Sequence, residues 1–348
     1  MKAHPAYSLV RSPVQRQPPV QRQRGVAVIM ALLLTTLAIT IVASLFWQQQ
    51  VQVRSIENQR LQLQKQWILR GALDWAALIL REDAKYSNAD TLEEPWAVPL
   101  AETRLDQYVE KGHADSDISD ATLSGSISDA QARYNLRNLC ISGTINPVEV
   151  AVFAKLLTNA HLNPALAQAT AEEMAVAQKL SPAEAQNLGT NNLGAKNSDT
   201  KINNQSADVL PMELTQVDDL LAVPGFTPEM LAKLKDFVII LPRATQVNVN
   251  TAPAEVLAAR VVGLTLTDAK RLVESRNKIA TFKDITDFST RLPGMNLQVS
   301  NSEVMTNYFL VNGKVRMNHV ESEMQALIER SDITTLPVTT NLVRIREY

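Results

Sequence analysis

The stretch Arg22-Gln23-Arg24-Gly25-Val26-Ala27-Val28-Ile29-Met30 decides the fold of this chain, and it continues without a charged residue as far as Trp47. As an α-helix, the 22 residues from Val26 to Trp47 would span about 33 Å, enough to cross the hydrocarbon core of a bilayer. The run is longer than the roughly 7–15 apolar residues of a cleaved secretory signal, and no small-x-small cleavage site follows it. We therefore predict a retained transmembrane helix over residues 26–47.

Charge is distributed unevenly around this helix. Residues 1–25 contain five Lys or Arg and no Asp or Glu, whereas the rest of the 348 residues contain 29 basic and 36 acidic residues. The positive-inside rule keeps the basic leader in the cytoplasm and places the chain from about residue 50 onward on the other side. That location is the periplasm if the source is a Gram-negative bacterium. An acidic mature chain is also a poor general binder of nucleic acid, which is bound through its phosphates.

The junction before the helix is more specific than an ordinary membrane anchor. Basic residues, one glycine at position 25 and an apolar helix from Val26 resemble a type IV prepilin-like leader, which prepilin peptidase cuts directly after the glycine. The alternative is an unprocessed signal anchor. In most prepilins the fifth residue after the cut is Glu, but this chain has Met30.

Helical sequence continues beyond the membrane, because no Pro or Gly occurs from Val26 to Arg70. Apolar residues recur at helical spacing through residues 48–82, which predicts the periplasmic, amphipathic part of the same helix. The complete helix, residues 26–82, would be about 85 Å long. The alternative, a coiled-coil stalk, is disfavoured because no sustained heptad runs through the segment.

The remaining chain has strand-like ends and a helical middle. Alternating sequence at residues 122–129, continuing into 132–139, and again at 303–317 and 319–328 predicts strands. Residues 146–298 have a helical pattern. We predict an α+β fold with a pilin-like core of the long helix and a small antiparallel sheet, in which residues 83–145 and 299–348 form the α/β core and residues 146–298 an inserted α-helical domain.

Two segments of the insertion are alike. Each has a helix, an apolar-Gly-apolar-Thr turn and a second helix, with the turn glycine at Gly225 or Gly263. Both resemble helix-hairpin-helix repeats, but DNA-binding versions have a second glycine two positions later, where this chain has Thr227 and Thr265. We expect both glycines to serve turn geometry and close helix packing.

Catalysis is not predicted. One cysteine, Cys140, excludes an internal disulfide or a cysteine cage for zinc, and we expect it to be a buried small hydrophobe. The histidines are widely separated in the sequence, without spaced ligand partners, and are expected to be surface or packing residues: His4, His113, His161 and His319. The chain also lacks a Gly-x-Ser-x-Gly motif and a Walker loop.

Taken in order, these features resemble the minor pseudopilin K family of the bacterial type II secretion system (general secretion pathway protein K). Beyond the leader junction, the segments that carry the resemblance are Asp129 with residues 132–139, Val247-Asn248-Val249-Asn250-Thr251-Ala252-Pro253, and Tyr308-Phe309-Leu310 with Val315-Arg316. The resemblance implies a single-pass inner-membrane protein that is processed and methylated after the leader. It also implies assembly with other minor pseudopilins at the tip of a short periplasmic pseudopilus, where the protein initiates or caps the filament for export of folded proteins across the outer membrane.

Calcium is the one cofactor that the resemblance brings into consideration, and Asp115, Asp117 and Asp120 form an acidic cluster. An EF-type loop would need Gly at Asp120 and Glu at Ser126, so that motif fails. A solvated acidic loop and a site assembled from distant oxygens stay open, and no metal ligand is assigned.

The alternative function is a membrane-anchored nucleic-acid receptor built on the helix-hairpin-helix-like repeats. The acidic mature chain and the prepilin-like junction favour the secretion subunit, and we expect no nucleic-acid partner. A salt-dependent gel shift with duplex and single-stranded DNA separates the two functions, since phosphate binding has a steep salt dependence.

Overall fold

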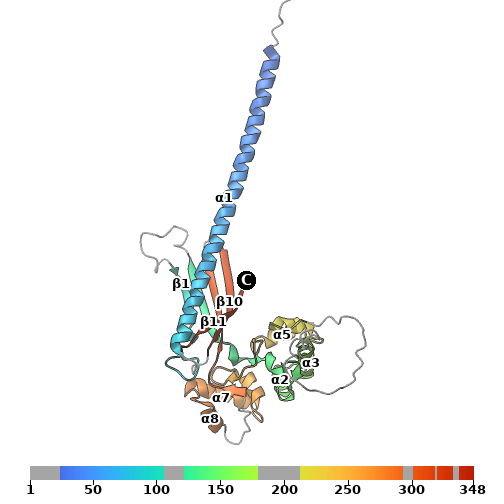
Figure 1. The fold of residues 1–348 in the computed structure, drawn as a ribbon, viewed down its shortest axis with the longest axis vertical. Helices are drawn as coiled ribbons and strands as arrows, with labels where there is room; N and C mark the ends of the chain where they lie inside the picture. Colours follow the sequence, from blue (N-terminus) through green and yellow to red (C-terminus); the bar gives the residue numbers. More distant parts are fainter. Residues whose placement is uncertain (1–23, 106–120, 179–211, 293–300, 318–319, 332–336) are drawn as a thin grey trace, which may run out of the picture. The chain divides into compact units, whose positions relative to one another are not determined.

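A computed structural model describes residues 24–105, 121–178, 212–292, 301–317, 320–331 and 337–348 (Figure 1). Residues 1–23 of the basic leader, which include His4, lie outside these residues, as do His113, His319 and the cluster of Asp115, Asp117 and Asp120. The described chain divides into two units, Met1–Leu63 and Gln64–Tyr348.

The first unit contains the beginning of helix α1, which extends from Arg24 to Asp83. Its most apolar window has a mean hydropathy of 2.7, and none of that window is buried within the protein. The helix starts and ends within two residues of the predicted bounds, 26 and 82. The prediction of one long N-terminal helix, apolar enough to cross a membrane, is thus confirmed.

The second unit contains a five-stranded antiparallel sheet in the order β1-β2-β9-β10-β11. Its strands are β1 (Leu100–Arg104), β2 (Thr122–Asp129), β9 (Tyr308–Met317), β10 (Val320–Arg330) and β11 (Thr340–Glu347). The strands β2, β9 and β10 lie where alternation predicted them. The edge strands β1 and β11 were not predicted.

Helix α1 packs on this sheet through one face. Leu69, Leu73, Ala76 and Leu80 recur every three or four residues and are at most 4% exposed. Gly313 in β9 faces Leu69, whose Cδ2 would lie 3.4 Å from a Cβ at that position. The long helix and the sheet together form the pilin-like α+β core.

The chain between β2 and β9 forms the insertion. Its helices are α2 (Pro147–Asn159), α3 (Leu166–Ala177), α5 (Pro228–Leu234), α6 (Ala254–Arg260), α7 (Leu266–Lys278) and α8 (Ile285–Thr290), with the 3₁₀ helix η6 (Val217–Ala222). Side chains of Asn146, Thr227, Thr265 and Asp284 accept hydrogen bonds from backbone N–H groups at the starts of four α-helices.

Short strands, which the sequence did not predict, also occur in and beside the helical insertion. Two parallel pairs tie the insertion to its flanks: β3 (Tyr134–Asn135) with β6 (Val238–Ile239), and β7 (Val247–Asn248) with β8 (Ser302–Glu303). The other short elements are η1 (Pro95–Ala97), η3 (Ala130–Ala132), η4 (Leu136–Leu139), β4 (Cys140–Ile141) and β5 (Thr144–Ile145). Two-residue strands leave too little alternation in the sequence to be recognised.

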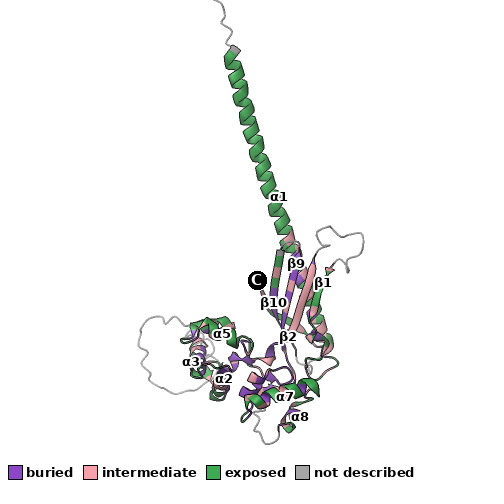
Figure 2. Cartoon of the chain, turned by 180° about the vertical axis from the view of Figure 1, so that it is seen from behind, coloured by how far each residue is buried: buried purple, intermediate pink, exposed green. Residues whose placement is uncertain are grey.

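One large hydrophobic core fills the insertion, and a smaller cluster links it to the sheet. In that smaller cluster Ile239 and Leu241 from the insertion pack with Tyr308, Leu310 and Leu327 from β9 and β10. Figure 2 shows buried residues concentrated in the sheet and the insertion, with exposed residues along the labelled part of α1. The insertion is therefore attached to the pilin-like core through packed side chains as well as through the chain itself.

Candidate functional site

A buried polar joint connects the pilin-like core with the insertion, and Arg330 is one of its centres. This residue ends β10 and is 2% exposed. Its guanidinium contacts Asp83 at 3.2 Å and Asp90 at 2.5 Å, and it donates hydrogen bonds to the carbonyls of Leu80 and Thr306. It also lies 4.8 Å from the ring centroid of Phe309. Arg330 thereby holds the end of α1, the loop after it and the start of β9 together.

The second centre is Asp129, the last residue of β2. One carboxylate oxygen accepts hydrogen bonds from Asn248 Nδ2 at 2.9 Å and from Thr251 Oγ1 at 2.5 Å. The other accepts from Thr306 Oγ1 and from the backbone N–H of Gln131, both at 2.7 Å. One oxygen of Asp129 thus fixes the Asn-x-Asn-Thr motif of the insertion to the end of the sheet, and the other holds Thr306, which lies just before β9.

The two centres share partners. Asn248 Nδ2 also donates to the backbone carbonyl of Asp90 at 3.0 Å. The second carboxylate oxygen of Asp90 accepts from the backbone N–H of Thr306 at 2.6 Å. Because Asn248 and Thr306 each contact both Asp90 and Asp129, the joint is one connected network, and such networks fix a single arrangement of the segments.

Negative charge exceeds positive charge in this joint. Burial raises the pKa of Asp83 to about 6, helped by the nearby charge of Glu94, although Arg330 opposes the shift. Burial also raises the pKa of Asp90 to about 7 and raises that of Asp129, against the hydrogen bonds that each accepts. One guanidinium does not offset the desolvation of these carboxylates, so the joint takes up protons more readily than exposed aspartates do.

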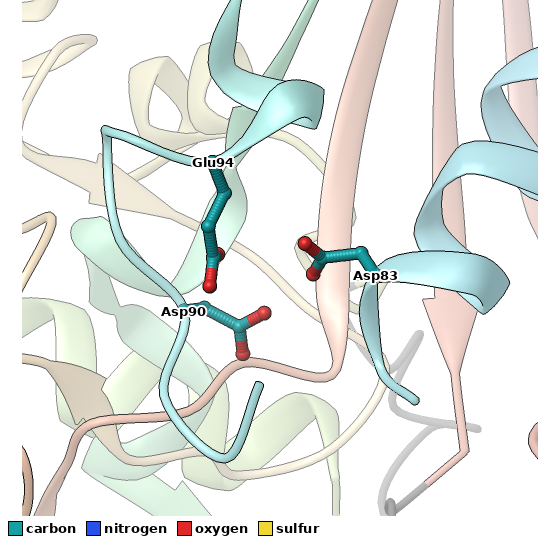
Figure 3. A group of neighbouring side chains, drawn as sticks. All are labelled: Asp83, Asp90 and Glu94. Carbon is teal, nitrogen blue, oxygen red and sulfur yellow. The ribbon is translucent and has the colours of Figure 1, made fainter. Parts of the chain in front are cut away.

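Figure 3 shows Asp83, Asp90 and Glu94 pointing toward one another, and one oxygen of each lies within 4.8 Å of the others. This cluster is a candidate for the calcium site to which the sequence assigned no ligands. Arg330 already pairs with both aspartates, and Glu94 Oε2 accepts from the Thr91 N–H and from Trp96 Nε1. A cation would have to displace or lie beside this guanidinium, so these residues fit an internal ion-pair network better than a calcium site.

A second buried ion pair lies inside the insertion. Arg260 donates two hydrogen bonds to Glu149, at 2.8 and 3.1 Å, and both side chains are 1% exposed. Asn301 Nδ2 also donates to Glu149, and Arg260 lies 5.6 Å from the ring centroid of Tyr134. This pair connects α2 with α6 and has a bidentate geometry suited to a buried charge pair.

Both predicted hairpin glycines have positive φ angles, +103° at Gly225 and +84° at Gly263. Gly225 follows η6, and a Cβ there would lie 2.8 Å from Leu166 Cδ2. Nothing lies within 4 Å of the corresponding position at Gly263. The expectation of close packing was therefore wrong for Gly263, which is in an open turn, although its backbone conformation favours glycine.

The other residues singled out in the sequence do not converge on one site. Gly25, Val26, Met30 and Trp47 are all on α1 in the first unit. Cys140 is buried, as expected, and burial raises the pKa of its thiol. His161 is exposed and has a φ of 59° just after α2.

Sequence reasoning missed Asp90, Thr306 and Arg330. It did quote Asp129 and the motif at residues 247–253, and the structure joins these two through Asn248 and Thr251. A charged residue that ends an otherwise strand-like run, as Arg330 does, was the only local signal of the first centre.

Comparisons with known proteins agree with this architecture. Two sequence models described as type II secretion system (T2SS), protein K match residues 132–243 and 247–312, which together make up just over half of the chain. The type II secretion system protein K of Pseudomonas aeruginosa is 26% identical over 320 residues, 88% of this chain and 89% of the relative. That of Pectobacterium carotovorum subsp. carotovorum is 23% identical over 333 residues, 89% and 93% of the two chains.

A solved structure shows the same fold. A chain from the GspK-GspI-GspJ complex of the enterotoxigenic Escherichia coli type 2 secretion system superposes with a TM-score of 0.59. The match covers 85% of this chain and 99% of the other, with 19% identity. The protein therefore belongs to the type II secretion system protein K family and has the role of a minor pseudopilin in that system.

Proposed function

We propose that this minor pseudopilin assembles with the other minor pseudopilins of its system and caps the tip of a short periplasmic pseudopilus. The observation that supports this proposal is the buried joint, because it fixes a large insertion to the pilin-like core at the C-terminal end of α1. Asp83 in the last turn of the helix and Arg330 at the end of β10 both belong to it. A rigidly attached domain at that end would prevent a further subunit from stacking there.

Processing and location follow from the leader. Prepilin peptidase cuts between Gly25 and Val26, the new N-terminus is methylated, and α1 anchors the chain in the inner membrane with the following residues in the periplasm. N-terminal sequencing of the mature protein tests this step. A start at residue 1, or beyond Trp47, would contradict it, whereas replacing Gly25 with a bulky residue should block cleavage.

Met30 supports a terminal position. In a pilin-type filament, Glu at the fifth mature position of one subunit neutralises the α-amino group of the neighbour above it. A subunit without this carboxylate would leave that amino group unpaired among apolar helices, where an unpaired charge costs about 3–5 kcal/mol. Met30 is therefore suited to a subunit that has no neighbour above it.

The other minor pseudopilins are the proposed partners, and the fold supports this choice. The structure that shares the fold was solved as a complex of GspK with GspI and GspJ. We expect a corresponding complex for this chain. We also expect it to bind no DNA, because the mature chain is acidic and both turns have Thr in place of the second glycine.

Labelling the insertion tests the cap directly. An epitope inserted in the segment 187–208, within full-length protein produced with all pseudopilins of its system, should be detected by immunogold electron microscopy at one end of each pseudopilus. An epitope on the major pseudopilin is the control and should be detected along the length. Regular labelling of this protein along the pseudopilus would overturn the proposal.

A further inference from the structure

One edge of the sheet is formed by β11, which pairs with β10 in an antiparallel ladder. The register of this ladder is unbroken from Arg344 to Glu347, and the backbone of Tyr348 exchanges two hydrogen bonds with that of Glu323. Because hydrogen-bonded pairs alternate along an antiparallel ladder, the N–H and C=O groups of Ile345 and Glu347 point away from β10. No other strand among the described residues pairs with this backbone edge.

The other edge of the sheet, β1, is less suited to an added strand. It has five residues, and its register with β2 is broken between Leu100 and Thr103. Its Glu102 is also paired with Arg316 of β9. Strand β11 has eight residues, and the irregularity in its register lies before Arg344. Short and bulged edges resist the addition of another strand, whereas a longer regular edge accepts one.

Two arginines lie on one face of β11. Arg344 is opposite Leu327 of β10, on the side of the sheet where Leu327 packs against the insertion. Strand alternation places Arg346 on the same face. The two guanidinium groups are near each other: burial and the charge of Arg346 lower the pKa of Arg344, although Tyr348 and Asp219 oppose the shift.

No side-chain carboxylate pairs with these two arginines. Among the described residues, Arg344 donates a hydrogen bond to the backbone carbonyl of Thr215, and neither Arg344 nor Arg346 has an Asp or Glu side chain within ion-pair distance. The acidic residues on the same face of β10 are already paired with other basic residues: Glu321 and Glu323 with Lys314, and Glu329 with Arg243. The edge therefore has positive charge that a partner could neutralise.

This charge pattern decides between possible partners. If β11 paired in antiparallel fashion with β11 of a second copy, centred on Ile345, then Arg344 of each copy would face Arg346 of the other. Like charges directly opposite each other destabilise a strand pair, whereas opposite charges stabilise it. The edge therefore favours a strand with Asp or Glu at alternating positions. On the other face of β11, Ile345 is 38% exposed and offers an apolar contact.

We propose that β11 accepts an added strand from the folded domain of another minor pseudopilin, with acidic side chains opposite Arg344 and Arg346. This inference rests on the proposed assembly with other minor pseudopilins, and it specifies a sheet edge and the chemistry of the strand that it binds. Because the pilin-like core contains a small antiparallel sheet, subunits built on the same plan have sheet edges of their own. Backbone hydrogen bonds at Ile345 and Glu347 supply affinity, and the arginines supply specificity.

Co-purification measures the contribution of the arginines. The full-length protein is produced with the other minor pseudopilins and purified from detergent-solubilised membranes, and the ratio of each partner to this chain is quantified. R346E should weaken one partner's affinity about tenfold or more, because its acidic strand would then face a like charge. The control is R271E, because Arg271 is exposed on α7 and lies outside β11.

I345P tests the backbone edge separately. Proline removes the outward N–H of Ile345 but leaves in place the hydrogen bonds that Arg344 and Arg346 make with β10. Recovery of the same partner should fall about as much as with R346E, whereas I345V, which retains the N–H, should recover it normally. Unchanged recovery of every partner with both R346E and I345P would overturn the inference.

Photo-crosslinking identifies the occupant. A benzophenone amino acid at position 347, which is exposed, should form an adduct with a strand of another minor pseudopilin that has Asp or Glu at alternating positions. The same group at position 279, also exposed, should not form this adduct. Absence of the adduct, or adducts only with a second copy of this chain or with a partner's N-terminal helix, would overturn the inference. If the unaltered protein recovers no minor pseudopilin, the proposed assembly itself fails and this inference fails with it.

Discussion

Arg260 and Arg330 are both almost completely buried, but their charge environments differ. Arg260 meets one carboxylate, Glu149, in a bidentate pair inside the insertion. Arg330 meets Asp83 and Asp90, with Asp129 and Glu94 close to the same network. The insertion is thus stabilised internally by a balanced pair, whereas its joint to the pilin-like core has excess negative charge.

This difference in charge makes the stability of the joint depend on pH. In the insertion one buried arginine pairs with one carboxylate, whereas in the joint one buried arginine pairs with two. The joint contains carboxyl groups whose pKa values are raised to about 6 and about 7, so protons can replace part of the missing positive charge. The attachment of the insertion should therefore respond to pH.

The largest loss is expected from Arg260→Met. It leaves the Glu149 carboxylate buried without its partner, which costs about 3–5 kcal/mol of unfolding free energy. Thermal unfolding of the full-length protein in non-ionic detergent, followed by near-ultraviolet circular dichroism, measures the loss. Arg271→Met is the control, because the Arg271–Asp268 pair is exposed and should contribute at most about 1 kcal/mol. Equal stability of the two variants would contradict the account of Arg260.

At pH 8 Arg330→Met should lower the free energy of unfolding about as much as Arg260→Met does. At pH 5 its loss should be smaller. At pH 8 Asp83 and Asp90 are ionised and lose their buried cation, whereas at pH 5 both take up protons. The same unfolding measurement at the two pH values, with Arg260→Met in parallel, tests the comparison. A loss at Arg330 that is independent of pH would show that its carboxylates are not the groups that matter.

Asp90→Asn should reduce the pH dependence of the unaltered protein. The folded-state pKa of Asp90, about 7, is above the unfolded value of about 3.9, so the folded protein binds more protons between these values. Stability should consequently fall as pH rises from about 4 to 7 and change little above that range. Unfolding midpoints measured from pH 5 to 8 should show a shallower fall in the variant, and an unchanged slope would exclude Asp90 as its source.

Smaller effects are expected at the two hairpin turns. Replacing Gly225 or Gly263 with Val should lower stability by about 1–3 kcal/mol, because both have positive φ angles. Gly225→Val should cost more, since its Cβ would clash with Leu166 and no such neighbour lies near Gly263. Equal losses of stability in the two variants would mean that the contact with Leu166 does not contribute to the cost of Gly225→Val. Unchanged stability together with lost DNA binding would instead restore the nucleic-acid function.

Sequence alone was sufficient for the features that depend on local composition. The uncharged run from Val26 and the absence of Gly and Pro up to Arg70 predicted α1 to within two residues at each end. Alternation predicted β2, β9 and β10, which lie in the interior of the sheet. The edge strand β11 was missed because most of its side chains are exposed, so burial imposes no clear alternation on it.

The joint could not be predicted from the sequence, because its residues are distant from one another along the chain. Arg330 and Asp90 are 240 residues apart, and Asp129 and Asn248 are 119 apart. Local patterns indicate which residues are apolar and which are polar, but they do not show which polar residues meet. The motif at residues 247–253 was recognisable only through resemblance, and its physical purpose, fixing the insertion to Asp129, became clear from the hydrogen bonds.

The number of copies of this chain in its assembly tests the central claim most directly. Native mass spectrometry of the full-length minor pseudopilin complex, released from detergent, should find one copy of this chain with one copy of each partner. Met30→Glu, which restores the usual carboxylate, should not raise this number by itself, because the attached insertion would still prevent a further subunit from stacking. Complexes that contain two or more copies of the unaltered chain, or long filaments made of this chain alone, would contradict the cap.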